Sequence, residues 1–391
     1  MPAASQKSRE LKYGLTLSGV IALRMMGLFL ILPVFMILAA DVPGYSPLAA
    51  GVAVGIYGLT QAVLQQPFGW LSDRWGRKPV MLLGLALFAV GGFVAATAES
   101  MQSLIAGRAL QGCGAIAGVA MALAADVTRP ERRSIIMAVI GMGIGASFLL
   151  SMMLAVPLST VLGLQGLFWL TAVFAIVGML LVMTVPNAPR LAVEHEQEHA
   201  GHAGSIWLLS LSVFLLHAVM TLLFVTLPPM LVGQFGLELP SHWKIYVPTM
   251  LLSAIFVFPL LRRIGATASE HRVLPWAFLA LAVSLALMPF SSPWLVLGLS
   301  VTTYFLGFNL LEAAMPAVLS RVSGSRGRGR RMGLYSSFQF LGAFVGGVSG
   351  GWLLAQLGSA SALIAAGVAC LLWGAVLKLL AKRSFPTGPS A

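Results

Sequence analysis

Four ionisable side chains interrupt long apolar stretches of this chain, and these are the residues best placed to do chemistry. Arg24, Arg108, His217 and Glu312 each lie within such a stretch, away from its ends. A charge in a hydrophobic environment is costly, so it usually marks an ion or proton pathway. Glu312 supplies the carboxyl group and His217 a ring that titrates near physiological pH. The sequence therefore predicts proton chemistry at Glu312 and His217.

Each of these residues also has a structural interpretation. Glu312 would then be a silent counter-charge to Arg24 or Arg108, and His217 a hydrogen-bonded packing residue. Arg24 supplies a fixed positive charge that either binds an anion or holds Glu312. Further polar groups of the apolar stretches either line a path for a solute or bond between helices: Gln61, Gln65, Gln66 and Asn309. We expect a substrate cavity lined by Arg24, Gln61, Gln65, Asn309 and Glu312.

The amino-acid composition indicates the class of protein in which these residues lie. Of the 391 residues, 58% are hydrophobic and only 9% are charged, whereas a soluble domain carries roughly 25% charged residues. The chain is therefore expected to be an all-α membrane protein. Cys113 and Cys370 both lie in apolar stretches, so neither a disulfide framework nor a metal spacing is indicated. We expect no cofactor, no metal and no enzymatic activity, since no nucleophile–base pair is evident.

Twelve apolar segments have the length of about 20 residues that a membrane-spanning helix needs. Their expected positions are 13–40, 47–70, 79–98, 101–126, 134–160, 164–185, 205–232, 243–261, 272–292, 294–320, 332–356 and 359–381. At about 1.5 Å per residue, Arg24, His217 and Glu312 fall near the middle of the bilayer. Arg108 falls nearer the outer end of its helix.

The basic residues predict the orientation, because Lys and Arg concentrate in cytoplasmic loops. Of the 24 Lys and Arg residues, 21 fall in loops and tails on one side, and Lys244 is the exception in the opposite loops. Both termini are therefore expected to be cytoplasmic. The net charge of +12 is explained by this topology and not by nucleic-acid binding.

A polar segment divides the chain into two halves of six predicted helices, 1–185 and 205–391, joined by a cytoplasmic linker at 186–204. His195, His199 and His202 with the linker's glutamates resemble a metal tract, but a solvated linker explains them better. The halves also repeat: a shift of 189 residues places LSDRWG (71–76) over LLRRIG (260–265). Such repeats are typical of transporters that rock about a midplane site.

The segment GWLSDRWGRKP, residues 69–79, is mostly polar and basic and lies between two apolar segments. Gly69 is expected to allow close helix contact and Gly76 to supply backbone freedom for a tight turn. Arg74 and Arg77 hold this turn on the cytoplasmic side. The pattern G-x-L-x-D-R-x-G-R-K-P is complete here, and it resembles the signature loop of the major facilitator superfamily of secondary transporters.

The resemblance to this superfamily covers about residues 11–383. LIAGRALQGCGA (104–115) is similar to its fourth-span pattern R-x-x-Q-G, and the resemblance implies a proton-coupling role for its arginine, Arg108. The likeness is closest to the drug–proton antiporter branch and its YajR-like members, through residues 22–35 and 307–321. These relatives carry a soluble C-terminal domain, which we expect this chain to lack. Unlike most drug antiporters, GMGIGASFLLSMM (141–153) has no G-P-x-x-G-G pattern.

The resemblance implies the major facilitator fold, with two pseudo-symmetric six-helix bundles and a central cavity lined by the first, fourth, seventh and tenth helices. It also implies that Asp126 pairs with the signature loop, so that Asp73, Arg77 and Asp126 form a conformational latch. Independent surface charges are the alternative. The expected function is proton-coupled efflux of small amphipathic or drug-like molecules by a monomer in the inner membrane. An importer or facilitator with the same fold is the alternative, and a membrane-embedded enzyme or receptor is least favoured.

Overall fold

The computed structural model describes residues 3–186, 203–266, 270–291, 294–323 and 328–384. No residue within these ranges forms a β-strand, in agreement with the predicted all-α class. The chain divides into two compact units, Met1–Glu194 and His195–Ala391. Most of the predicted linker, including its three histidines, lies outside the described residues.

The helices of the first unit are, in chain order, α1 (Ala3–Phe29), α2 (Phe35–Leu38), η1 (Ala39–Asp41), α3 (Pro47–Trp75), α4 (Arg77–Ala96), α5 (Met101–Gly112), α6 (Ala117–Asp126) and α7 (Pro130–Thr184). Those of the second unit are α8 (Ala203–Gly233), η2 (Leu239–Ser241), α9 (Trp243–Ala266), α10 (Glu270–Leu287), η3 (Met288–Phe290), α11 (Trp294–Val322) and α12 (Arg328–Ser384).

Nine stretches of the described residues are long and apolar enough to cross a membrane. Two of them, within α7 and α12, each change direction at a glycine with positive φ, Gly163 (65°) and Gly358 (78°). Only glycine adopts this conformation readily, so each long helix supplies two crossings. These breaks lie where the sequence separates 134–160 from 164–185 and 332–356 from 359–381. With α1, which is not among the nine stretches, the described helices cover the twelve segments expected from the sequence.

Two predicted spans are not continuous helices. The segment 13–40 is helical only to Phe29, and its last turns are the separate α2 and η1. Pro33 lies in the break, where it has no backbone N–H to donate. The segment 101–126 divides into α5 and α6 around Gly114, whose added Cβ would lie 2.4 Å from the Gly84 carbonyl oxygen. Close packing on α4 therefore accompanies this second break.

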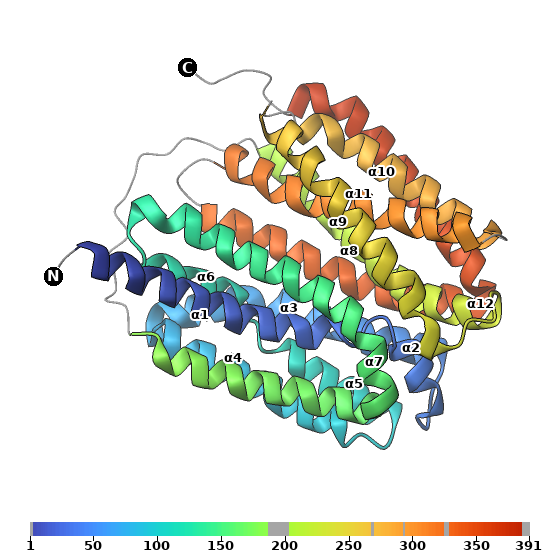
Figure 1. The fold of residues 1–391 in the computed structure, drawn as a ribbon, viewed down its shortest axis with the longest axis horizontal. Helices are drawn as coiled ribbons and strands as arrows, with labels where there is room; N and C mark the ends of the chain where they lie inside the picture. The colour runs from blue at the N-terminus through green and yellow to red at the C-terminus, as the bar shows by residue number, and fades with distance from the viewer. Residues whose placement is uncertain (1–2, 187–202, 267–269, 292–293, 324–327, 385–391) are drawn as a thin grey trace. The chain divides into compact units, whose positions relative to one another are not determined.

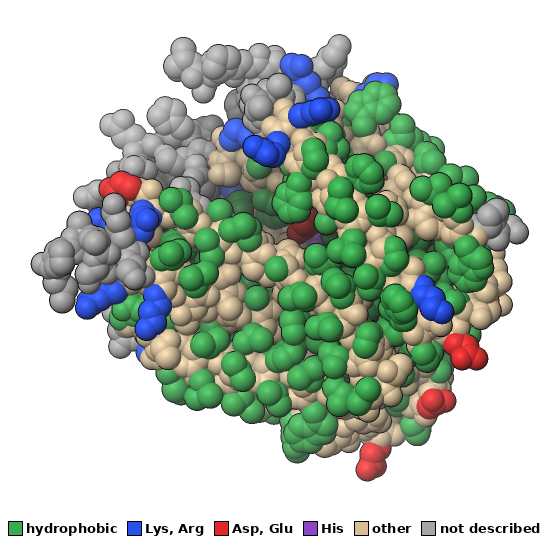
Figure 2. Space-filling model, in the orientation of Figure 1, with side chains coloured by type: hydrophobic (Ala, Val, Ile, Leu, Met, Phe, Trp, Pro, Cys, Tyr) green, Lys and Arg blue, Asp and Glu red, His purple; other side chains and the backbone are tan. Residues whose placement is uncertain are grey.

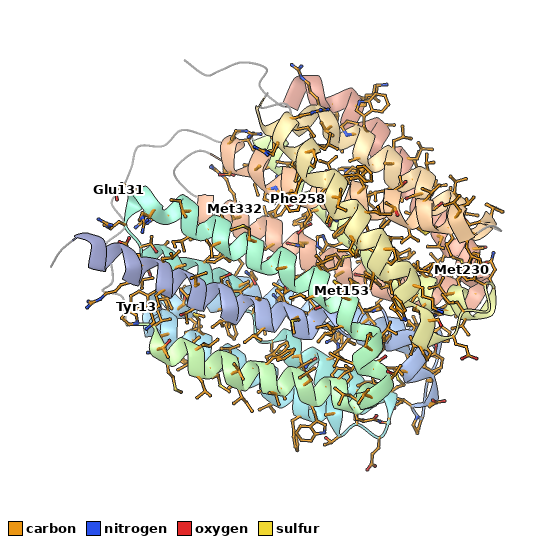
Figure 3. The ribbon with its side chains drawn as sticks, in the orientation of Figure 1. Tyr13, Glu131, Met153, Met230, Phe258 and Met332 are labelled. Carbon is orange, nitrogen blue, oxygen red and sulfur yellow. The ribbon has the colours of Figure 1, made fainter. Side chains whose placement is uncertain are left out.

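Within each unit the helices pack into one layered bundle (Figure 1). In the first unit, α1 and α4 pack along α7, and α5 packs against α3 and α4. Figure 3 shows Tyr13 and Glu131 at the same end of this unit, where α1 and α7 begin. In the second unit, α12 packs most extensively against α8, and α11 lies against α9 and α10. The functional side chains project from these packed helices.

The contact between α8 and α12 depends on glycines. A Cβ added at Gly342 would lie 2.1 Å from the Phe214 carbonyl oxygen, and one at Gly346 would lie 2.0 Å from that of Ala218. Without hydrophobic exclusion from water, membrane helices associate through such close backbone approaches at small residues. This packing brings the part of α12 that precedes Gly358 next to the middle of α8.

The outer surface is suited to a bilayer. On the face in Figure 2 hydrophobic side chains are widespread, and most of the Lys, Arg, Asp and Glu side chains lie toward the margins, although an acidic side chain and a histidine are visible near the centre. Large apolar side chains are exposed on several helices, among them Phe258 on α9 (67% exposed) and Leu180 on α7 (59%). In water such a surface would aggregate, so lipid is its expected solvent.

Candidate functional site

The second unit brings together two of the predicted proton-coupling residues. The His217 Nε2 atom on α8 lies 3.8 Å from the Glu312 Oε2 atom on α11. The side-chain amide of Gln339 on α12 lies between them, because its Nε2 atom donates a hydrogen bond of 3.2 Å to Glu312 Oε1 and lies 2.8 Å from His217 Nε2. Three helices therefore contribute one side chain each to a polar cluster, defined here as His217, Glu312 and Gln339.

The hydrogen bonds of His217 determine its tautomer. Its Nδ1 atom lies 3.2 Å from the Val213 carbonyl oxygen, which can only accept a hydrogen bond. Nδ1 therefore carries the proton, and Nε2 is left as the acceptor for the Gln339 amide. The imidazole is neutral in this arrangement. A proton can bind at Nε2 only after Gln339 turns its carbonyl oxygen toward the ring.

Glu312 is the more accessible member of the polar cluster. Its side chain is 39% exposed, whereas that of His217 is 9% exposed. The Glu312 Oε2 atom is buried without a hydrogen-bond partner in the described structure. This carboxylate oxygen therefore has acceptor capacity that no described side chain uses.

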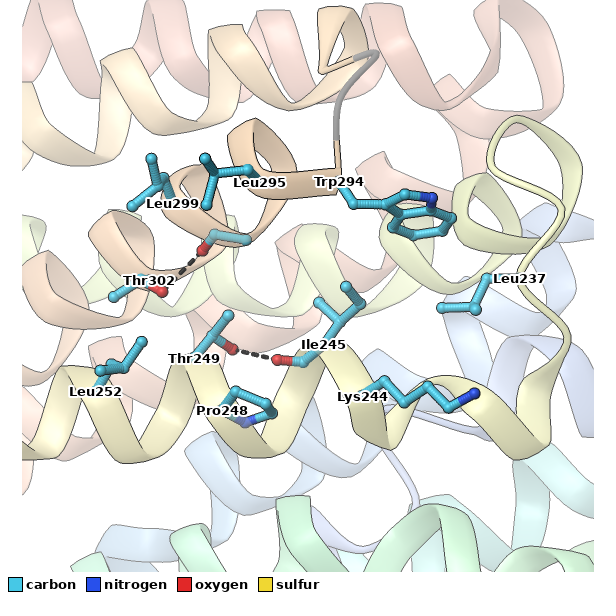
Figure 4. A pocket seen from close by; sticks show the side chains of 11 residues that line it. Leu237, Lys244, Ile245, Pro248, Thr249, Leu252, Trp294, Leu295, Leu299 and Thr302 are labelled. Atoms are coloured by element: carbon cyan, nitrogen blue, oxygen red, sulfur yellow. Dashed lines mark hydrogen bonds between the residues drawn. The ribbon is translucent and has the colours of Figure 1, made fainter.

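The other predicted polar residue of the second unit lies apart from this cluster. Asn309 on α11 donates a hydrogen bond of 2.8 Å to Ser253 on α9. A pocket of about 540 Å³ lies between the N-terminal parts of the same two helices (Figure 4). Its hydroxyl groups on Thr249 and Thr302 donate to carbonyl oxygens of their own helices. Apart from Lys244, the lining is therefore effectively apolar, and none of the predicted site residues lines the pocket.

The two buried arginines lie in the first unit, each 1% exposed. Arg24 on α1 donates through Nε to the Gly114 carbonyl oxygen at 3.1 Å and through Nη2 to Gln61 Oε1. At the helix break the Gly114 carbonyl also accepts a hydrogen bond of 2.9 Å from the Ile116 N–H, and its second lone pair is available to Arg24. Gln61 is fully buried, and Gln65, one turn further along α3, is 8% exposed.

Arg108 forms its contacts through the R-x-x-Q-G pattern. Its Nη1 atom donates to Gln111 Oε1 at 2.9 Å and its Nε to the Ala53 carbonyl oxygen at 3.3 Å. Gln111 in turn donates to Thr171 at 2.8 Å. The glycine of the pattern, Gly112, packs against α3, where a Cβ would lie 2.2 Å from the Tyr57 carbonyl oxygen. The pattern therefore fixes an arginine against α3.

The contacts of the predicted cavity residues fall into separate groups. Arg24 and Gln61 contact each other, whereas Asn309 and Glu312 have different partners in the second unit. The hydrogen bonds of Arg24 and Arg108 go to groups of their own unit, and those of Glu312 to Gln339. The substrate cavity remains a prediction.

The predicted latch residues meet at the turn between α3 and α4. The Arg77 guanidinium lies 2.5 Å from Asp73 and 3.2 Å from Asp126, and it also donates to Ser72 at 2.6 Å. The turn itself is shorter than expected, because α3 continues to Trp75 and α4 begins at Arg77. Gly76 between them has φ of 99°, which confirms its predicted backbone freedom.

Gly69 and Arg74, two further residues of the signature segment, lie outside the contacts made by Arg77. The prediction for Gly69 is wrong for this structure, since an added Cβ would meet nothing within 4 Å. Because no atom lies that close to an added Cβ, the glycine is not needed for a close contact here. Arg74 lies over the Trp70 ring at 4.0 Å and not in the Arg77 cluster.

Two contacts were not predicted from the sequence. Gln339 is a polar residue within an apolar segment, and that signal was available. Glu10 was not singled out because it precedes the first apolar segment. Its carboxylate, 6% exposed, accepts hydrogen bonds of 2.7 and 3.3 Å from Arg129. The hydrogen bond from Arg129 lowers the pKa of Glu10 below its ordinary value of 4.5.

Comparison with known proteins agrees with this architecture. The family model of the Major Facilitator Superfamily matches residues 17–269 and 209–391. The Escherichia coli protein "Inner membrane transport protein YajR" is 37% identical over 366 residues, which cover 91% of this chain and 80% of that protein. The Bacillus subtilis "Multidrug resistance protein 1" is 24% identical over 78% of this chain and 80% of its own. A crystal structure of a D-xylose-proton symporter has a TM-score of 0.77, with 15% identity over 96% of this chain and 98% of that one. The chain belongs to the major facilitator superfamily and is a multi-pass membrane transporter.

Proposed function

We propose that this major facilitator superfamily transporter couples proton movement to the efflux of small amphipathic molecules across the inner membrane, by alternating access. The observation that carries the proposal is the pairing of Glu312 with His217 at 3.8 Å, with Gln339 between them. Both groups lie within membrane-spanning helices, where ionisable residues are rare and mark proton pathways. The name of the Bacillus subtilis relative, a multidrug resistance protein, supports efflux.

Glu312 is the proposed proton carrier. Its unpartnered Oε2 atom takes up the proton, which neutralises the carboxylate before the site changes its exposure between the two sides of the membrane. One proton that moves through the membrane potential supplies about 2.3 kcal/mol per 100 mV. This energy drives substrate movement only if protonation and substrate binding favour different conformations.

His217 is the neighbouring acceptor. Its Nε2 atom already accepts from Gln339, so a proton passes between Glu312 and His217 only when the Gln339 amide rotates. Because of this requirement, protonation of Glu312 and protonation of His217 are two distinct steps. Arg108 on α5 is then a fixed positive charge rather than a carrier, since an arginine does not release its proton under physiological conditions.

The test is transport by purified protein in proteoliposomes with an imposed pH gradient, against a panel of lipophilic cations, anions and sugars. Glu312→Gln mimics the protonated carboxyl group, so gradient-driven accumulation is lost while substrate exchange persists. His217→Gln is measured beside it, and Glu238→Gln, an exposed acid before η2, is the control that keeps coupling. Accumulation by Glu312→Gln with unchanged pH dependence would show that another group carries the proton.

A further inference from the structure

The first unit contains a buried group of hydrogen-bond donors that no acidic side chain of the described residues balances. The guanidinium carbons of Arg24 and Arg108 lie 5.8 and 4.9 Å from the centre of the same Tyr57 ring. Neither arginine forms an ion pair with an acid in the part of the chain that the structure describes. Charged groups so deeply buried are normally paired with an opposite charge.

Four atoms of this group lack a hydrogen-bond partner although they are buried. They are Arg24 Nη1, Arg108 Nη2, the Tyr57 hydroxyl and Gln61 Nε2. All four are able to donate a hydrogen bond, and of these only the Tyr57 hydroxyl can also accept one. The remaining guanidinium nitrogens already donate to the Gly114 and Ala53 carbonyls and to glutamine oxygens. The group therefore has spare donors and positive charge, and its chemical complement is a negatively charged acceptor.

The helix break beside Arg24 adds to the positive electrostatic potential of this group of donors. The ten-residue helix α6 begins at Ala117, directly after the break whose Gly114 carbonyl holds Arg24. The first turn of a helix carries a partial positive charge, and discontinuous membrane helices use this end to hold anionic groups of a substrate. The Gln65 amide lies at this turn, 3.2 Å from where a Cβ of Gly118 would be.

We propose that this donor cluster, defined as Arg24, Tyr57, Gln61 and Arg108, binds the carboxylate or another oxyanion of the transported molecule. The substrates are then amphipathic organic anions rather than lipophilic cations or sugars. A cationic substrate is disfavoured because two unbalanced arginines repel it. This inference rests on the proposed transport function and narrows its substrate class. Proton uptake at Glu312 is a separate step in the second unit.

The experiment measures binding by purified protein in lipid nanodiscs, with three probes of similar size: 2-naphthoate, 2-naphthamide and 2-naphthylmethylamine. Thermal stabilisation and equilibrium dialysis report binding without any transport. The expected result is that only naphthoate binds. Tyr57→Phe keeps the ring but removes one spare donor, so it weakens naphthoate binding about tenfold, the usual effect of one hydrogen bond to a charged group. Arg24→Gln and Arg108→Gln abolish it.

The matched control is Lys378→Gln, which removes a positive charge from an exposed position of α12 and leaves naphthoate binding unchanged. Tyr57→Phe alters only a hydroxyl group, so it still tests the proposal if the arginine variants misfold. Equal binding of the three probes, or full naphthoate binding by Tyr57→Phe, would overturn the proposal. A chloride titration distinguishes an organic substrate anion from an inorganic one. If chloride stabilises the protein as well as naphthoate does and also displaces naphthoate, the cluster holds an inorganic ion. That result would overturn the substrate assignment.

Failure of this inference is distinguishable from failure of the transport proposal. Glu312→Gln leaves the donor cluster intact and is expected to bind naphthoate like the unmodified protein. If naphthoate binds but no pH gradient drives its accumulation, the anion site stands and proton coupling is wrong. If a cation accumulates under the gradient and naphthoate does not bind, coupling stands and the anion site is wrong.

Discussion

His217 and Glu312 share one hydrogen-bonding partner, the side-chain amide of Gln339. The amide nitrogen has two hydrogens, and this geometry uses one for each neighbour. Gln339 therefore positions the carboxyl and imidazole groups relative to each other, although it does not titrate itself.

Replacing Gln339 with Leu is expected to lower gradient-driven transport at least tenfold while the protein folds normally. Leucine has a similar volume but leaves the Glu312 carboxylate without its donor, a loss of about 1.5–3 kcal/mol for a hydrogen bond to a charged group. Initial rates in proteoliposomes at several external pH values measure the effect. Gln339→Glu restores a hydrogen-bonding side chain and is expected to alter the pH profile instead. An unchanged rate and pH profile in Gln339→Leu would contradict the positioning role.

Asp73→Asn and Asp126→Asn are each expected to lower transport while expression and helix content persist. Both carboxylates contact Arg77, so either change releases the same guanidinium. Residues within one ion-pair network are not additive, and the double variant is therefore expected to lose little more than either single variant. Transport rates of the three variants give the comparison, and full additivity would rule out a shared latch.

Glu10 is expected to stabilise the protein in a pH-dependent way. Its pKa is lowered in the folded state by the hydrogen bond from Arg129. The carboxylate then contributes stability that is fully present above its ordinary pKa of 4.5 and is lost as the pH falls through the lower folded value. Glu10→Gln should therefore melt at a lower temperature than the unmodified protein at pH 7, and the two melting temperatures should converge in acid. A difference that stays constant with pH would show that packing, and not the ion pair, is responsible.

Gly346→Ala is expected to destabilise the second unit. The new Cβ would lie 2.0 Å from the Ala218 carbonyl oxygen, so α8 and α12 would have to separate. Forcing an extra methyl group into a packed interface costs typically 1–3 kcal/mol. The melting temperature in detergent measures this loss. Gly298→Ala on α11 is the matched control, since its Cβ would meet nothing within 4 Å. Equal melting of the two variants would contradict the close contact.

The predicted orientation places Ala203 on the cytoplasmic side and Glu238 on the outer side. Both residues are exposed, so single cysteines introduced there are open to labelling. In a background with Cys113 and Cys370 replaced by alanine, a membrane-impermeant maleimide is expected to label Glu238→Cys in intact cells. Ala203→Cys should react only after the membrane is opened. Labelling of both sites from outside would contradict the topology.

Much of the fold follows from the sequence alone, because hydropathy and charge are local properties. The apolar segments mark the crossings, and the glycines at 163 and 358 lie where the segments divide. Glu312 and His217 stand out for the same reason, since an ionisable group within an apolar segment is visible without any knowledge of its neighbours. The signature segment likewise points to Asp73 and Arg77 through its resemblance to the family's loop, and the structure places their side chains 2.5 Å apart.

Only the tertiary structure decided which of these residues meet. Gln339 and His217 are 122 residues apart in the chain, and the packing of α12 on α8 through Gly342 and Gly346 brings them together. The break between α5 and α6 likewise makes the Gly114 carbonyl available to Arg24, although no proline marks it. Gly69 shows the converse, since its local pattern predicts a contact that the neighbouring helices do not supply. Side-chain partners depend on how helices pack, and the packing depends on residues far apart in the sequence.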